Sequence, residues 1–260
     1  MEKISVEELK KIQINILLDV AKFCDENGIN YFLDAGTLLG AVRHKGYIPW
    51  DDDIDIGMLR EDYNIFIDKY KSKKNYECMS IEKGNHPYPF AKVLDRDTIL
   101  YEPNEKGIKY SVNIDIFVYD YVPEDKKTQD KIVRKRDFLS KLNLLRIGWI
   151  YSDKKFVYLL KKVLSIFLKV FPKYYFTKQN LKLIKKYSSC KTNYVIGYTG
   201  SDRAILRKVL EEYIEIEFEN YYFKVPKNYD ARLTTLYGDY MSLPPLDKQV
   251  SHHKFIAYKK

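Results

Sequence analysis

Cysteine and long apolar runs are scarce in this chain of 260 residues. The three cysteines, Cys24, Cys78 and Cys190, are odd in number and show no C-x-x-C spacing, so neither a disulfide framework nor a zinc site is expected. No stretch reaches the roughly 20 apolar residues that span a bilayer, and the N-terminus lacks the apolar region of a secretory signal. These absences predict a soluble protein of a reducing compartment, and we expect it in the cytoplasm.

Charge is abundant and unbalanced. Hydrophobic residues make up 45% of the chain and charged residues 31%, which is typical of a globular protein. The formal net charge is +9, and a surplus of that size favours an anionic partner such as a nucleotide, a phosphate-rich polymer or a membrane surface. No nucleic-acid recognition module is present, so nucleic acid is not an expected partner.

Helix and strand patterns are mixed along the chain. A capping pattern at Ser5 and Glu8 starts a predicted helix over 5–27. Short helices are expected after Asp34 and over 60–71, and strands over 29–33, 53–57, 76–81, 90–94, 110–118, 213–218 and 221–225. We therefore predict an α+β fold with a mixed β-sheet flanked by helices. We expect a single domain, 1–260, with a basic helical lobe at about 126–187.

The densest chemical pattern is an acidic run followed by isoleucines. On a strand, Asp53 and Asp55 point to one face while the isoleucines between and after them point to the other. Asp115, also between two isoleucines, completes a three-carboxylate site if its strand lies alongside. Crowded carboxylates stay ionised only beside a cation, and oxygen ligands suit Mg²⁺ or Mn²⁺. Such a site can clamp a phosphate, with Asp115 as a candidate general base.

The acidic run is open to three other interpretations. Asp51, Asp53 and Asp55 match the first, third and fifth positions of an EF-hand loop. The pattern fails at Ile56, where that loop needs glycine, and at Asp62, where it needs glutamate. A solvated acidic turn and the D-x-D of a nucleotide-sugar glycosyltransferase are the other two alternatives.

A glycine turn precedes the acidic run. Gly36 allows close approach of a ligand to the backbone. Thr37 offers a hydroxyl at a helix N-terminus, where phosphate is favoured. Arg43, His44 and Lys45 follow and are candidates for the phosphates of a donor, the alternative being an ordinary solvated basic loop.

Three further basic residues are candidates for the same site. Lys92 interrupts an apolar strand, and a charge in such a place usually has a partner, so we expect it to face the cleft. His252 and His253, near the C-terminus, are candidates for contacts with phosphate or with the acceptor.

The run from Leu33 to Gly57 resembles the signature of the LicD family of phosphotransferases, which also includes fukutin-like proteins. Tyr237–Met241 with Leu243–Pro245 is similar to the C-terminal element of that family, and Asn113–Phe117 to its third-carboxylate strand. The resemblance thus covers both ends of the chain, while residues 126–187 carry no motif that matches.

The resemblance implies a nucleotidyltransferase fold in which Gly36 and Thr37 form the glycine motif, Asp53 and Asp55 bind metal, and Asp115 is the third carboxylate. Family members move phosphocholine, or a phospho-polyol such as glycerol or ribitol phosphate, from a CDP-linked donor to a sugar hydroxyl. Bacterial members decorate teichoic acids, capsules or lipopolysaccharides, so we expect a phosphotransferase acting on a glycan. The alternatives are a glycosyltransferase, a nucleotidyltransferase that releases pyrophosphate, and a non-enzymatic protein that binds anionic polymers or membrane surfaces.

Residues 154–171 combine apolar side chains with lysines. Lys155, Lys162 and Lys169 fall on one helical stripe, and Phe156, Leu160, Val163, Phe167 and Val170 share another face. One interpretation is an interfacial helix on the inner face of a bacterial plasma membrane, near a lipid-linked acceptor. The other is a helix whose apolar side packs on the domain.

Overall fold

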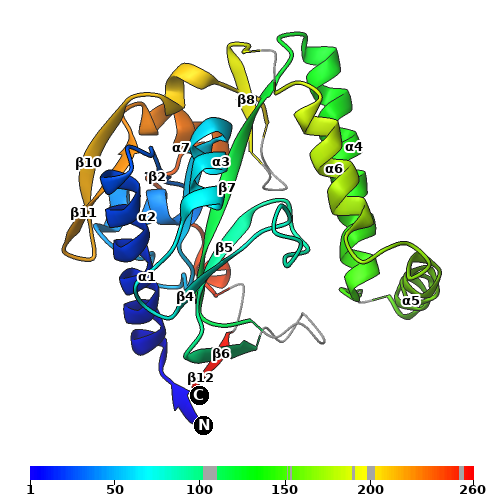
Figure 1. The fold of residues 1–260 in the computed structure, drawn as a ribbon, viewed down its shortest axis with the longest axis horizontal. Helices are drawn as coiled ribbons and strands as arrows, with labels where there is room; N and C mark the ends of the chain where they lie inside the picture. The colour runs from blue at the N-terminus through cyan, green and yellow to red at the C-terminus, as the bar shows by residue number, and fades with distance from the viewer. Residues whose placement is uncertain (102–109, 151, 153, 189–190, 198–202, 252–254) are drawn as a thin grey trace.

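The computed structural model describes residues 1–101, 110–150, 152, 154–188, 191–197, 203–251 and 255–260 (Figure 1). Helices flank a mixed β-sheet, which confirms the predicted α+β fold class. Cys24 and Cys78 are free, buried thiols, and Cys190 lies outside the described residues.

The main sheet has seven strands within the described part of the chain. Its first five lie in the order β2 (Phe32–Leu33), β3 (Asp55–Leu59), β7 (Asn113–Val122), β5 (Ala91–Asp95) and β4 (Tyr76–Met79). The far half of β7 pairs instead with β8 (Tyr194–Ile196), which pairs with β9 (Ile205–Leu206). β3 and β7 are parallel, whereas their other pairings are antiparallel. The ten-residue β7 therefore joins both parts of the sheet.

One strand begins later than its alternating pattern predicts. β3 starts at Asp55, so the prediction that Asp53 lies on this strand is wrong. The physical reason is a side chain of the first helix: Gln13 Nε2 donates to the carbonyl of Asp52 at 3.0 Å and to that of Asn113 at 3.3 Å. The segment before Asp55 is thus held by an amide side chain at Asp52 and by one backbone bond, in which the carbonyl of Ile54 accepts the N–H of Asp115 at 2.9 Å.

Two smaller sheets complete the β-structure. β1 (Glu2–Ile4), β12 (Ile256–Lys259) and β6 (Thr98–Tyr101) bring the two ends of the chain together, as Figure 1 shows. The two strands predicted at 213–218 and 221–225 form a hairpin, β10 (Tyr213–Phe218) and β11 (Tyr221–Pro226). Glu219 and Asn220 both have positive φ, 52° and 65°, which is the backbone of a tight hairpin turn.

The predicted N-terminal helix is α1 (Val6–Glu26). It begins where it does because the Ser5 hydroxyl accepts the N–H of Glu8, and it buries Ile16, Leu17 and Val20 in the main core. The other helices around the sheet are α2 (Ala35–His44), α3 (Arg60–Lys69) and α7 (Tyr229–Tyr237), with short 3₁₀ turns at Arg207–Leu210 and Leu246–Lys248.

The predicted lysine-rich helices form a lobe. α4 (Lys126–Ile147) and α6 (Tyr175–Lys185) lie side by side, and α5 (Lys155–Leu168) lies at their end, at the right of Figure 1. Leu181 and Ile184 of α6 pack into the main core, so the lobe is anchored on the sheet.

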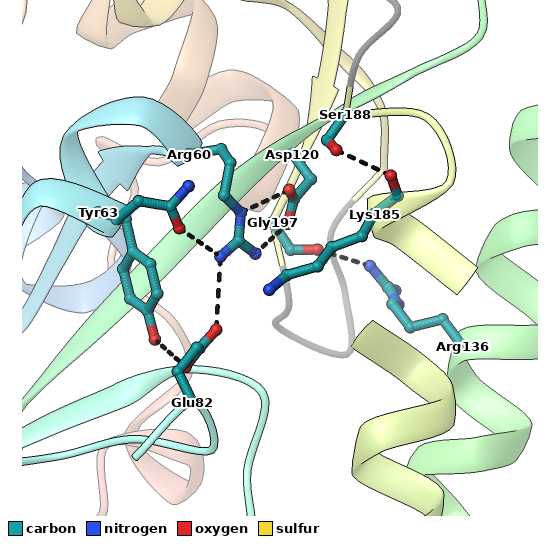
Figure 2. Close-up of polar contacts among 9 residues, drawn as sticks. Arg60, Tyr63, Glu82, Asp120, Arg136, Lys185, Ser188 and Gly197 are labelled. Atoms are coloured by element: carbon teal, nitrogen blue, oxygen red, sulfur yellow. Dashed lines mark hydrogen bonds and ion pairs between the residues drawn. The ribbon is translucent and has the colours of Figure 1, made fainter. Parts of the chain in front are cut away.

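Buried arginines tie the helices to the sheet (Figure 2). Arg60 at the start of α3 donates to both carboxylate oxygens of Asp120 on β7, at 2.7 and 2.5 Å, and its Nη1 lies 3.5 Å from Glu82. Arg136 of α4 donates to the carbonyl of Gly197 at 2.8 Å. Both side chains are nearly inaccessible to solvent, so these contacts connect α3 to β7 and the lobe to the end of β8.

Candidate active site

Three charged side chains stand in a row across the central sheet. Asp55 on β3 is paired in register with Asp115 on β7, and Asp115 is paired with Lys92 on β5. Directly paired residues point to the same face, and neighbouring strands lie about 4.8 Å apart. The sequence prediction that the strand of Asp115 lies beside that of Asp55 is therefore confirmed by the register.

Asp55 is fixed by two backbone contacts from the glycine turn. Its N–H donates to the hydroxyl of Thr37 at 2.8 Å, and its carbonyl accepts the N–H of Asp34 at 3.0 Å. Thr37 is itself buried. The hydroxyl that we had assigned to phosphate thus holds a candidate metal ligand in place.

Two hollows meet at Asp53. The inner pocket, of about 150 Å³, is lined by Asp53, Asp115, Lys92 and the rings of Tyr88, Phe90 and Tyr110. The outer cleft is larger and more open, and is lined by Gly36, Asp51, Asp53, Asp55, Tyr237 and Asp239. Asp53 borders both, so a single acidic residue lies between two spaces that different ligands can enter.

Asp51 is a pocket residue that the sequence argument left out of the site. A Cβ on Gly36 would lie 2.6 Å from Asp51 Oδ2, so the absence of a side chain at Gly36 makes room for this carboxylate. The carboxylate of Asp52, by contrast, accepts the hydroxyl of Ser251 at 2.8 Å. The spacing of Asp51, two residues before Asp53 and four before Asp55, was the sequence feature that could have placed it in the site.

The basic loop after α2 is divided by the fold. Arg43 lines the outer cleft and donates to the carbonyls of Tyr240 at 2.7 Å and Ser242 at 3.3 Å. His44 lines neither hollow, and burial together with the charge of Arg43 lowers its pKa. Lys45 forms an ion pair with Glu217 at 3.4 Å and also lies outside both hollows. Of the three, only Arg43 is brought to the carboxylates.

Lys92 lines the inner pocket and so faces the site, as predicted. Its Nζ lies 2.5 Å from Asp115 Oδ1 and 3.0 Å from Asn113 Oδ1. The same nitrogen lies 5.6 Å from the ring centroid of Phe90 and 5.5 Å from that of Tyr110. His252 and His253 lie outside the described residues.

A buried ion pair supports the start of α2. Asp34, the N-cap of α2, accepts from Nε and Nη2 of Arg232 at 3.0 and 3.1 Å, and also from the hydroxyl of Tyr119. Asp34 and Arg232 are almost fully buried. Sequence reasoning missed this pair because its members are far apart in the chain, and it fixes α7 against the glycine turn.

The electrostatics of the site favour a cation. Burial, followed by the charges of Asp53 and Asp115, raises the pKa of Asp55 well above its ordinary value. A solvated acidic turn does not fit a buried Asp55. An EF-hand loop is excluded because residues 55–59 form a strand and 60–69 a helix.

The donor set of the site consists of hard oxygen ligands. Within the described residues, no group of three or more His, Cys, Asp or Glu side chains is arranged to hold an ion by itself. Mg²⁺, however, is commonly held by one or two carboxylates together with water and substrate phosphates. Asp53 and Asp55, which both line the outer cleft, fit that requirement.

Comparisons with known proteins agree with these observations. The family model described as LicD/FKTN/FKRP, nucleotidyltransferase domain, matches residues 28–145. Lipopolysaccharide cholinephosphotransferase LicD of Haemophilus influenzae is 33% identical over 273 residues, which cover 99% of both chains. Ribitol 5-phosphate transferase FKRP of Homo sapiens is 54% identical over 35 residues, 14% of this chain and 7% of that protein. An uncharacterized protein of Rickettsia prowazekii, RP689, is 43% identical over 68 residues, 23% of this chain and 26% of its own.

Proposed function

We propose that this chain, which belongs to the LicD family, transfers a phosphorylated small group from a CDP-linked donor to a sugar hydroxyl of a cell-surface glycan. The transferred group is phosphocholine or a phospho-polyol such as glycerol or ribitol phosphate. Two relatives support this range, since one is named a lipopolysaccharide cholinephosphotransferase and the other a ribitol 5-phosphate transferase.

The observation that carries the proposal is the position of Asp53 between two hollows. A transfer reaction needs two substrates whose reacting atoms meet at one point. The outer cleft, beside the N-terminus of α2, suits the diphosphate of the donor. The inner pocket, with Asp115 and Lys92 on its wall, suits the acceptor hydroxyl.

The reaction follows from this arrangement. The acceptor oxygen attacks the phosphorus of the transferred group, the new P–O bond forms, and the bond from that phosphorus to the oxygen of CMP breaks. The hydroxyl proton passes to Asp115. Lys92 holds Asp115 at 2.5 Å and adds positive charge beside the phosphoryl oxygens.

Mg²⁺ or Mn²⁺ is the cofactor we propose, held by Asp53 and Asp55 with Asp115 nearby. Bound there, it would neutralise charge on the phosphate oxygens. Thr37 and the backbone of Asp34 keep Asp55 in position for this role. Arg43 serves the site mainly by joining α2 to the C-terminal element through its two carbonyl contacts.

The test is a panel of donors. The protein is incubated with Mg²⁺, a lipopolysaccharide or teichoic acid acceptor, and CDP-choline, CDP-glycerol or CDP-ribitol in separate reactions, and the released nucleotide is identified. We expect CMP from one donor with wild-type protein and none with folded Asp53→Asn. Release of UDP, UMP or GDP from a nucleotide sugar would instead identify a glycosyltransferase, and pyrophosphate release a nucleotidyltransferase.

A non-enzymatic role as a binder of anionic polymers explains the net charge but not the site. Acidic side chains converge on the hollows around Asp53 in a protein of net charge +9. Carboxylates arranged in this way repel an anionic polymer unless a cation is present, so the enzymatic interpretation accounts for more of the structure.

We also propose that α5 contacts the membrane surface that carries the acceptor, at the inner face of a bacterial plasma membrane. Only Ser165 and Leu168 of this helix are buried, whereas Phe156 is 72% exposed and Phe167 68%. The alternative, in which the apolar side packs on the domain, does not account for these exposures. Among the described residues, no helix is long and apolar enough to cross a membrane.

Vesicle flotation tests this contact. Vesicles rich in anionic lipid should carry the protein upward, and added salt should weaken the binding. Phe156→Ser/Phe167→Ser should abolish flotation but keep turnover on a soluble acceptor. Equal flotation of the double variant and the wild type would refute the proposed contact.

A further inference from the structure

A basic groove separates α5 from the core of the protein. Its lobe side presents Arg146, Lys162, Lys169 and Lys173, and its core side includes Tyr110. No acidic residue is among the described residues that line it. The groove is therefore a concentrated positive surface, in contrast to the outer cleft and the inner pocket, which both include aspartates.

The groove cations lack local counter-charges. The sequence contains no aspartate or glutamate between Lys154 and Ser201. Within the described part of the chain, Lys162, Lys169 and Lys173 form no ion pair. Clustered like charges repel one another and raise the local concentration of anions, so the groove is suited to an anionic ligand.

The basic groove adjoins the inner pocket. Tyr110 lines both the basic groove and the inner pocket, and Asp53 lines both the inner pocket and the outer cleft. The three hollows thus follow one another in the order outer cleft, inner pocket, basic groove. A ligand in the basic groove lies on the acceptor side of Asp53, away from the glycine turn.

The lysines of the groove are not on the face of α5 that is offered to a membrane. Lys162 and Lys169 line the groove together with the buried Ser165. Phe156 and Phe167, the most exposed of the large apolar side chains of α5, do not line it. One helix therefore has two separate surfaces, of which the basic one faces the core.

We propose that the basic groove binds the phosphate groups of an anionic glycan acceptor and so directs its reacting hydroxyl into the inner pocket. This assignment rests on the proposed transfer to a glycan. Lysine ammonium groups bind phosphate as point charges, and the guanidinium of Arg146 provides planar donors for its oxygens. The groove thereby selects phosphorylated glycans over neutral ones.

The experiment measures binding in the absence of donor, so it does not depend on turnover. An oligosaccharide released from lipopolysaccharide is used as prepared and after phosphatase treatment, with wild-type protein and Lys162→Glu/Lys169→Glu. The matched control is Lys135→Glu/Lys178→Glu, which makes the same charge change at exposed residues of α4 and α6 outside the groove. Circular dichroism confirms folding, and Lys169→Gln provides a milder variant of the groove.

We expect the groove variant to bind the phosphorylated oligosaccharide about tenfold or more weakly than the wild type, a change of about 1.4 kcal/mol. The control should stay within about twofold, as expected for screened, distant charges. Equal weakening by both variants, or equal binding of the two oligosaccharides by wild-type protein, would overturn the assignment. Loss of binding to anionic vesicles alone would assign the lysines to the bilayer instead. If no donor is turned over but the groove variant still loses affinity, the proposed transfer fails and the anion site stands.

Discussion

The hydroxyl of Thr37 offers a sharp test of how the site is built. It accepts the N–H of Asp55 at 2.8 Å in a buried position. Thr37→Val keeps the shape of the side chain but leaves that N–H without a partner, which costs about 1–3 kcal/mol. For a chain of this size, that loss lowers the melting temperature by roughly 2–4 °C per kcal/mol. Because Asp55 loses its anchor, kcat should fall as well.

Thr37→Ser is the matched control, since it keeps the hydroxyl and removes one methyl group, worth about 0.8 kcal/mol. Unfolding in urea gives the free energies, and CMP release gives kcat and KM. If the hydroxyl binds donor phosphate instead, Thr37→Val should raise the KM for donor and leave the free energy of unfolding unchanged. That outcome would refute the positioning role.

Three further predictions concern the support and charge of the site. Arg232→Leu leaves Asp34 buried without its ion-pair partner, so urea unfolding should show a loss of about 3–5 kcal/mol; a loss below 1 kcal/mol, roughly the value of a surface pair, would contradict this. Gly40→Ala places a Cβ 2.4 Å from the carbonyl oxygen of Gly46. This overlap with the backbone should lower the free energy of unfolding by about 1–3 kcal/mol, and an unchanged melting temperature would contradict the prediction. In metal-free protein, Asp55→Asn should raise the melting temperature at neutral pH, because the raised pKa of Asp55 makes its ionisation unfavourable in the folded state. The gain should begin to shrink as the pH falls through that raised pKa and should vanish below the ordinary carboxyl pKa of about 3.9, where Asp55 is protonated in the folded and the unfolded chain alike. A gain that grows toward low pH would show that the sign is wrong.

The sequence predicted correctly those features that depend only on residues close together in the chain. The cap at Ser5, the strands at 213–218 and 221–225, and the lysine-rich helices of the lobe all form close to the predicted positions. Apolar flanks on both acidic strands indicated which face Asp55 and Asp115 share, and the register of β3 and β7 brings them together. The isoleucines that flank these residues carry this information because they must be buried.

Contacts between distant segments were beyond the reach of the sequence. Lys45 lies in a basic loop by sequence, but Glu217 from the β10–β11 hairpin takes its ammonium group. The start of β3 depends on Gln13, which is on α1. The short strands β1, β6, β8, β9 and β12 were not expected, because two to four residues carry too little periodicity to identify a strand. Their partners, not their own side chains, decide that they form.

The most direct test of the account follows phosphorus through the reaction by ³¹P NMR, with wild-type protein, the CDP-linked donor that the panel identifies, a glycan acceptor and Mg²⁺. We predict one phosphodiester on the glycan for each CMP released, and arrest of both signals when EDTA is added. Transfer that continues in EDTA, or phosphorus that appears as pyrophosphate while the glycan stays unmodified, would contradict a cation-assisted phosphotransferase centred on Asp53 and Asp55.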